Sequence, residues 1–267
     1  MRIISWNING YRAITGQNPS KRYDKVTKEN KLFRFIESEK PDIICLQETK
    51  ASPGQIDDEL LCPDGYDYFY SSSIEKKGYS GVAVFYKIKP EKIINNLNEK
   101  RFDVEGRVIE MHFKDFILFN VYFPKGYEDS ERLNYKLEFY DVFFNYVEEL
   151  NRKNKKIIIT GDYNTAHHEI DLARPKENIT VSGFMPIERE KLDWIETLGY
   201  VDTFRLFNKG AGHYTWWSQR GRARENNIGW RIDYFFVTKN VLPLVKDSYH
   251  KPDVLGSDHC PIILELV

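Results

Sequence analysis

Short apolar runs rich in Val, Ile, Phe and Tyr, often bounded by turn residues, recur along the chain and predict many strands. We expect these strands at 2–6, 42–46, 66–72, 80–88, 107–113, 115–122, 156–161, 213–218, 231–238 and 260–266. Helical patterns are fewer, and they predict helices at 28–39, 131–150 and 187–198. Pro41 closes the first of these, while Pro186 and Gly199 mark the start and the end of the third.

Strands with helices interspersed between some of them indicate sheets that stack face to face and are covered outside by helices. No Gly/Ser linker, repeat or low-complexity tract divides the chain, and the acidic motifs described below come from both halves. We therefore expect one α/β domain over residues 1–267.

Composition indicates a globular protein without an overall basic field. Hydrophobic residues make up 41% of the chain, enough for a sizeable core, and the formal net charge is −1, so any affinity for nucleic acid would have to come from local patches. The three cysteines are odd in number and lack paired metal spacing, which indicates a reducing compartment. Strand-like sequence from Arg2 leaves no room for a signal peptide, and no apolar run approaches the roughly 20 residues of a membrane span. We expect a cytoplasmic protein.

Acids and amides stand where several predicted strands begin or end. Glu48 and Asp162 follow apolar runs, Asp258 precedes one, and Asn7 follows the first strand. Side chains at strand ends can converge on one cleft, and such oxygen ligands suit Mg²⁺ or Mn²⁺. The pattern predicts a metal-dependent site that cleaves phosphodiesters.

Seven motifs, in order along the chain, resemble the exonuclease III family of AP endonucleases within the endonuclease/exonuclease/phosphatase superfamily. They lie at 4–10, 47–50, 78–82, 121–124, 161–164, 229–234 and 256–259. The resemblance implies a four-layer α/β sandwich of two packed mixed sheets flanked by helices, as in DNase I. It also implies a monomeric Mg²⁺-dependent enzyme, with Mn²⁺ as a substitute, that cuts double-stranded DNA 5′ to an abasic site. Activities of a 3′→5′ exonuclease and a 3′-phosphodiesterase are expected beside it.

The same resemblance assigns the chemistry to particular positions. Metal binding falls to six residues: Asn7, Glu48, Asp162, Asn164, Asp258 and His259. Catalysis is assigned to five residues, three of which are also expected to bind the metal: Tyr122, Asp162, Asn164, Asp233 and His259. Asp162 is expected to orient the attacking water or to protonate the leaving 3′ oxygen, and Asp233 to fix the imidazole of His259. Outside this context, Gly161-Asp162 would be an ordinary turn.

DNA contacts are expected from scattered basic and aromatic residues: Arg12, Lys50, Tyr79, Arg107, Lys125, Arg220, Arg222 and Arg224. Arg231 belongs to the same arginine-rich stretch, although a solvated basic loop would look alike. Lys125 stands where relatives commonly carry Asn, which predicts a point-charge contact. Trp216, Trp230 and Ile232 match the pocket that holds a flipped-out abasic sugar in relatives.

The sequence also supports predictions for several further segments. The adjacent His167 and His168 are not expected to bind one ion, because neighbouring side chains rarely aim at one point. Residues 15–30 form a polar, Lys-rich insertion that we interpret as a mobile loop. The runs 171–178 and 214–218 resemble archaeal and some bacterial members, one branch of which also nicks at deoxyuridine.

Two alternatives remain open at the level of sequence. A phosphodiesterase acting on inositol phosphates or phospholipids would share Asn7, Glu48, Asp162, Asn164, Asp258 and His259, although the tryptophans and the arginine-rich loop have no evident use there. A non-catalytic protein that binds DNA damage would need a broken catalytic position, and every position is intact.

Overall fold

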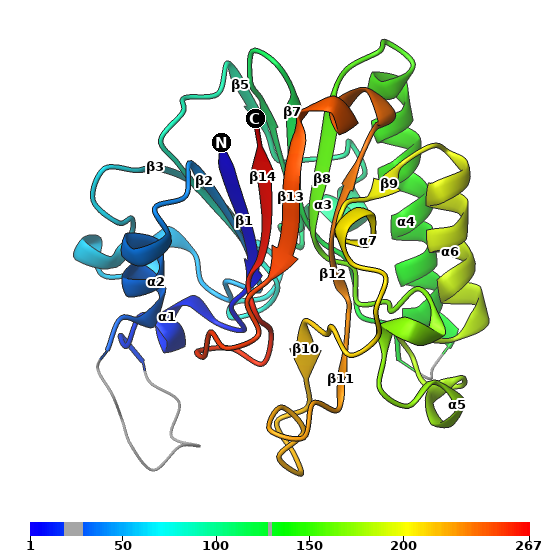
Figure 1. Ribbon diagram of the computed structural model, residues 1–267. Coiled ribbons are helices and arrows are strands. Elements are labelled where there is room, and N and C mark those ends of the chain that lie inside the picture. The colour runs from blue at the N-terminus through cyan, green and yellow to red at the C-terminus, as the bar shows by residue number, and fades with distance from the viewer. Residues whose placement is uncertain (19–28, 128–129) are drawn as a thin grey trace.

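Two six-stranded mixed sheets form the centre of the protein, in a computed structural model that describes residues 1–18, 29–127 and 130–267 (Figure 1). Most of the predicted 15–30 insertion lies outside the described residues. The first sheet has the order β13 (Val245–His250), β14 (Ile262–Leu266), β1 (Arg2–Asn7), β2 (Ile43–Gln47), β4 (Val82–Tyr86) and β3 (Asp67–Ser71). The second has the order β5 (Lys92–Ile94), β6 (Val108–His112), β7 (Ile117–Tyr122), β8 (Ile157–Asp162), β12 (Asp233–Val237) and β9 (Val201–Asp202).

Helices cover the outer faces of both sheets, as Figure 1 shows. The first sheet carries α1 (Tyr11–Ile14) and α2 (Lys31–Glu39), and the second carries α4 (Ser130–Asn151) and α6 (Pro186–Thr197). Shorter elements lie in the connections: α3 (Lys100–Asp103), α5 (Pro175–Asn178), α7 (Phe204–Phe207) and 3₁₀ turns at Pro53–Gln55, Asp58–Leu60, Glu169–Asp171 and Lys239–Leu244. The predicted four-layer sandwich is confirmed.

The core is divided into layers by the two sheets. Ile3 and Val84 of the first sheet pack against Leu118, Ile158 and Phe235 of the second, and all five are buried. Separate apolar layers fill the space under α2 and under α4 and α6. Because strand residues alternate between faces, each central strand contributes to two of these layers and is apolar on both sides.

Strand register brings distant residues to one edge. β1 and β2 are parallel, with Asn7 opposite Gln47, and β7 and β8 are parallel, with Tyr122 opposite Asp162. β12 is antiparallel to β8 and sets Asp233 opposite Asp162. The carboxyl ends of β1, β2, β7 and β8 therefore meet near the start of β12.

The sequence pattern missed several peripheral strands. β5, β9 and β13 lie at sheet edges, and β11 (Gly229–Trp230) forms a two-stranded sheet with β10 (Trp216–Trp217). Edge strands are short or charged and expose one face, so their apolar signal is weak. The strand predicted at 213–218 shortens to β10, and the hydroxyl of Thr215, which precedes β10, donates to Asp233 at the start of β12.

A buried ion cluster corrects the prediction for Arg231. Its side chain is fully buried, with Nε 2.7 Å from Asp171 Oδ1 and Nη1 2.7 Å from Asp202 Oδ2. Arg205 also pairs with Asp171. Arg231 therefore does not face DNA, and the cluster instead ties the segment after β11 to the loop that follows β8. Among the described residues, no helix combines the length and apolar content needed to cross a bilayer.

Asp171→Asn is expected to destabilise the protein, because it leaves the buried Arg231 with one carboxylate instead of two. Breaking a buried ion pair costs about 3–5 kcal/mol in free energy of unfolding. Urea unfolding would measure the loss. Glu177→Gln is the matched control, because it removes an exposed carboxylate 3.5 Å from Arg174 and should cost less than about 1 kcal/mol. Equal losses in the two variants would contradict the role of the cluster.

Lowering the pH should reduce the loss of stability caused by Asp171→Asn. Burial alone would raise the pKa of Asp171, but Arg231 and Arg205 more than offset it and hold that pKa below its usual range. The carboxylate thus stabilises the fold above its unfolded pKa of about 3.9, and this contribution is lost as the pH falls below that value. In urea titrations at decreasing pH, the difference in stability between wild type and Asp171→Asn should narrow below about pH 4. A constant difference would show that ionisation of Asp171 is not the cause.

Candidate active site

The side chain of Asn7 joins the ends of the two sheets. Its Nδ2 donates 2.8 Å hydrogen bonds to Glu48 Oε1, just beyond β2, and to Asp162 Oδ2, at the end of β8. Asn7 and Asp162 are fully buried. One amide therefore holds two carboxylates from different sheets at one point.

Glu48 occupies the turn that follows β2. Its φ of 51° is in the left-handed region, which a non-glycine residue rarely adopts without structural support. Lys50 Nζ lies 2.7 Å from Glu48 Oε2 and donates at 2.5 Å to Asn9 Oδ1. Burial opposes ionisation of Glu48, but Lys50 and the Asn7 amide more than offset it, so its pKa is lowered. Glu48 is a carboxylate at neutral pH.

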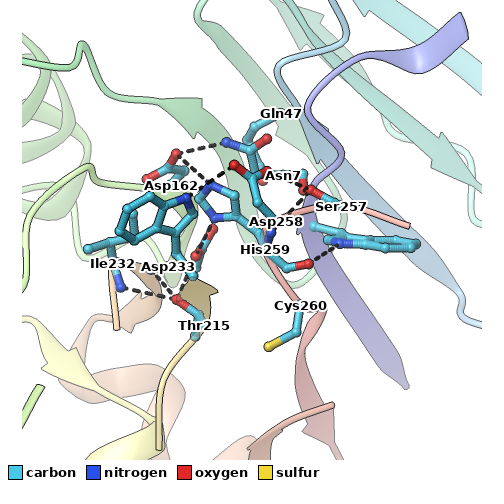
Figure 2. Close-up of polar contacts among 12 residues, drawn as sticks. Asn7, Gln47, Asp162, Thr215, Ile232, Asp233, Ser257, Asp258, His259 and Cys260 are labelled. Carbon is cyan, nitrogen blue, oxygen red and sulfur yellow. Dashed lines mark hydrogen bonds and ion pairs between the residues drawn. The ribbon is translucent and has the colours of Figure 1, made fainter. Parts of the chain in front are cut away.

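Asp162 is the most deeply placed acid of the site (Figure 2). It comes so close to β7 because Gly161 precedes it: a Cβ there would lie 1.8 Å from the carbonyl oxygen of Val121. The main-chain NH of Asn164 donates to Asp162 Oδ1 at 2.7 Å. Burial raises the pKa of Asp162, and the nearby charges of Asp233 and Glu48 raise it further, whereas His259 opposes them. Such a carboxyl group is suited to proton transfer near neutral pH.

His259 is fixed by a buried chain of hydrogen bonds (Figure 2). Its Nδ1 lies 2.9 Å from Asp233 Oδ2, which also accepts from the hydroxyl of Thr215 at 2.6 Å. Its Nε2 lies 3.8 Å from Asp162 Oδ2. Burial alone would lower the pKa of His259, but Asp233 and Asp162 outweigh it and raise that pKa. The raised pKa favours the protonated ring, and its Nε2 faces Asp162.

Three other predicted residues border these groups. Asp258 accepts from Asn9 Nδ2 at 2.8 Å and from the indole NH of Trp216 at 3.2 Å. Burial and the charge of Glu48 raise the pKa of Tyr122 well above its usual value, so its phenol stays protonated and can donate. Asn164 Nδ2 donates to the carbonyl of Phe123 at 3.0 Å, which fixes its amide beside the end of β7.

An apolar group that we call the tryptophan cluster lies beside the acids. It comprises Ala166, Leu172, Phe184, Trp216, Trp230 and Ile232. The rings of Trp216 and Trp230 meet edge to face at 6.3 Å, and both are only partly buried. Because Trp216 bonds Asp258, the cluster directly adjoins the acidic residues.

The donor set fits a hard divalent cation. One ligand atom from each of Glu48, Asp162 and His259 lies within 4.8 Å of the others. Carboxylate oxygens predominate, which suits Mg²⁺ or Mn²⁺. The pKa of Asp162 is raised first by burial and then by the charges of Asp233 and Glu48, and a cation would favour its ionised form. Asn7 and Asp258, which are also predicted ligands, are linked to this group through Glu48 and Asn9.

The predicted DNA contacts divide into exposed and enclosed residues. Lys125, Arg220 and Arg222 are exposed, whereas Arg12, Lys50 and Tyr79 are half-buried. Two predictions need correction. Arg107 is 2% exposed, and its guanidinium donates to the carbonyl of Tyr122 and to the hydroxyl of Tyr79, so it positions those residues and cannot reach DNA itself. The guanidinium of Arg224 donates to the carbonyls of Pro252, Val254 and Ser257, so it stabilises the loop before Asp258.

The structure places the side chains of His167 and His168 against each other. Their rings stack at 3.6 Å with an angle of 24° between planes. One nitrogen of each lies within 4.8 Å of the other and of a carboxylate oxygen of Asp193.

Sequence reasoning missed the residues that hold the loop after β8. Lys136 and Glu188 are fully buried and lie 2.6 Å apart. Lys136 Nζ also donates to the carbonyl of Asn164 at 2.7 Å, and Glu188 accepts from the NH of Gly183. The sequence contains a signal for this buried pair, because Lys136 interrupts the apolar stripe of α4 that includes Tyr140. A lysine on a buried helical face requires a partner.

Comparison with known proteins agrees with this geometry. Residues 4–259 match the model of the Endonuclease/Exonuclease/phosphatase family. An exodeoxyribonuclease of Bacillus subtilis is 40% identical over 99% of this chain and 98% of its own. A DNA-(apurinic or apyrimidinic site) endonuclease of Dictyostelium discoideum is 41% identical over 98% of this chain and 69% of its own. The structure of an AP endonuclease from Archaeoglobus fulgidus superposes with a TM-score of 0.86 at 26% identity, covering 100% of this chain and 99% of that one. The chain therefore belongs to the endonuclease/exonuclease/phosphatase family of hydrolases, in its exonuclease III-like branch.

Proposed function

We propose that this protein is a Mg²⁺-dependent DNA repair nuclease that hydrolyses the phosphodiester 5′ to an abasic site. The observation that carries the proposal is the hydrogen bond from Trp216 to Asp258, which sets the tryptophan cluster against the acidic residues. A nuclease for abasic DNA needs both parts, one for the phosphate and one for a sugar without a base. The names of the Bacillus and Dictyostelium relatives support the same substrate class.

Asp162 is the proposed proton acceptor for the attacking water. Its raised pKa brings it closer to the operating pH than an ordinary aspartate, which improves general base catalysis. His259 Nε2, at 3.8 Å, places a positive charge beside it and so favours its ionised form. The Asn7 amide and the NH of Asn164 fix both carboxylate oxygens, so the acceptor is oriented before substrate binds.

Donors around Asp162 face the place where charge develops on the phosphate. The imidazolium of His259, the neutral phenol of Tyr122 and the amide of Asn164 can each donate there. Glu48 and Asp162, with Asn7 and Asp258 beside them, would hold the cation, because a protonated His259 has no free ring nitrogen to offer it. Mg²⁺ bound there supplies positive charge that opposes the charge on the phosphate and on the departing 3′ oxygen.

Lesion recognition is proposed for the tryptophan cluster. Extruding a nucleotide costs a few kcal/mol and costs least where the base is already missing. Trp216, Trp230 and Ile232 would then contact the bare sugar, while the exposed Lys125, Arg220 and Arg222 would contact phosphates on either side. The same bond-breaking site would account for 3′→5′ exonuclease and 3′-phosphodiesterase activities, because these also hydrolyse phosphodiesters in DNA. Nicking at deoxyuridine would extend this activity, on the basis of the sequence resemblance alone.

The proposal predicts metal-dependent incision of abasic DNA. Labelled duplexes carrying an abasic analogue, deoxyuridine or neither would be incubated with Mg²⁺ or with EDTA and resolved on a gel. Wild type should cut 5′ to the abasic analogue and leave a 3′-hydroxyl only when Mg²⁺ is present. Asp162→Asn should cut roughly 100-fold more slowly or worse, because the proton acceptor is lost.

Asp141→Asn is the matched control, because Asp141 pairs on the surface with Lys191, outside the site, and its loss should leave the rate unchanged. Undiminished cutting by Asp162→Asn would remove Asp162 from the mechanism. No incision of any duplex, with release of phosphate or headgroup from inositol phosphates or phospholipids, would instead support the alternative phosphodiesterase. Binding of the abasic duplex without cleavage by either wild type or Asp162→Asn would support a damage-binding protein.

Trp230→Ala is expected to weaken the preference for abasic over intact DNA. Losing one apolar wall for the sugar costs about 1.4 kcal/mol, or roughly tenfold in relative kcat/KM. Competition between abasic and intact duplexes would measure the change. Trp194→Ala is the control, because Trp194 packs against Phe144 in the core under α6 and should lower stability without altering the preference. An unchanged preference in Trp230→Ala would make Trp230 a purely structural residue.

A further inference from the structure

A second group of potential metal ligands lies between the loop after β8 and helix α6. His167 and His168 come from the loop, and Asp193 comes from α6. One ligand atom from each lies within 4.8 Å of the others. This group shares no residue with the Glu48–Asp162–His259 group, and α6 lies on the outer face of the second sheet beside α4 (Figure 1).

His167 is held in a single orientation. Its side chain is 1% exposed. Its main-chain NH donates to the hydroxyl of Tyr234, and its main-chain carbonyl accepts from Arg189 Nε at 2.7 Å. Its Nε2 lies 2.7 Å from Asp193 Oδ1. A fixed imidazole needs little reorganisation to bind an ion, which favours affinity.

The second ring nitrogen of His167 also faces a carboxylate. Nδ1 lies 3.9 Å from Glu196 Oε1, one helical turn from Asp193 on α6. A histidine that binds a metal through one nitrogen commonly donates the N–H of the other to a carboxylate, which fixes the tautomer. Asp193 can therefore share an ion with His167 Nε2 while Glu196 orients the ring.

The buried position of His167 favours its neutral imidazole. Burial lowers the pKa of His167, and the adjacent His168 lowers it further. Neutral imidazole is the form that binds metals.

We propose that His167, His168 and Asp193 form a binding site for a borderline transition-metal ion, with Zn²⁺ as its representative, and that Glu196 orients His167. Two nitrogen ligands select such an ion over Mg²⁺, which prefers oxygen. Bonds of about 2.0–2.2 Å require the ligand atoms to move inward. Asp193 is 61% exposed and His168 is exposed, so both have room to do so.

The bound ion would cross-link the loop that follows Asp162 and Asn164 to α6. Lys136 and Glu188 already connect the same two segments. Zinc should therefore raise the melting temperature of the full-length protein without taking part in the chemistry at Asp162.

The test is zinc binding by the full-length protein in millimolar Mg²⁺. Wild type, His168→Ala, Asp193→Asn and Glu48→Gln would be dialysed against micromolar Zn²⁺ and the bound zinc measured by elemental mass spectrometry. His168→Ala and Asp193→Asn should each bind one zinc fewer per chain than wild type, whereas Glu48→Gln should keep this ion. Zinc should raise the melting temperature of wild type and Glu48→Gln by a few degrees and leave that of His168→Ala unchanged. Glu196→Gln should keep the ion but weaken its affinity by roughly tenfold or more.

His213→Ala is the matched control, because His213 is another exposed histidine and lies outside the group. It should bind zinc as wild type does. His168 and Asp193 are exposed, so their variants should fold, and their melting temperatures without zinc would verify this. Equal zinc content in wild type, His168→Ala and Asp193→Asn, or a loss of zinc seen only in Glu48→Gln, would overturn the proposal.

Discussion

The amide of Asn7 is the contact on which the site depends. With two hydrogen bonds it holds Glu48 of one sheet and Asp162 of the other at the same point. This arrangement gathers negative charge where burial makes charge costly. Lys50 and His259 each offset part of it, and a divalent cation would relieve the remainder. The chemistry and the electrostatic strain therefore have one origin, which is the convergence of carboxylates between two packed sheets.

Two buried ion clusters keep that arrangement in place from the outer side. Lys136 and Glu188 hold the loop that carries Asn164, and Arg231 joins Asp171 to Asp202 beneath the tryptophan cluster. Buried pairs of this kind stabilise little relative to apolar residues, but each is costly to break. They are well suited to fixing the position of loops, because a loop that moves away leaves a charge without its partner. The proposed zinc site would act on the same loop from the surface of α6.

Sequence reasoning was most accurate where one local pattern determines the outcome. The central strands are apolar on both faces, and α4 and α6 have helical apolar spacing, so these elements were predicted nearly to their ends. Edge strands such as β13 were missed, because one exposed face weakens the pattern. The arginines show the same limit. Arg107, Arg224 and Arg231 look like phosphate ligands in the sequence, yet their guanidinium groups are occupied by protein carbonyls, hydroxyls or carboxylates.

The sequence alone determined the layered α/β fold, the strand-end acids and the resemblance to exonuclease III, because apolar periodicity and short motifs are local properties. Tertiary structure decided which polar groups meet. The Asn7 bridge joins residues 155 positions apart, and Lys136 reaches Glu188 across 52. It also decided that adjacent histidines stack with their nitrogens close to Asp193. Such contacts depend on the register of strands and the packing of helices, and no periodicity in the sequence records them.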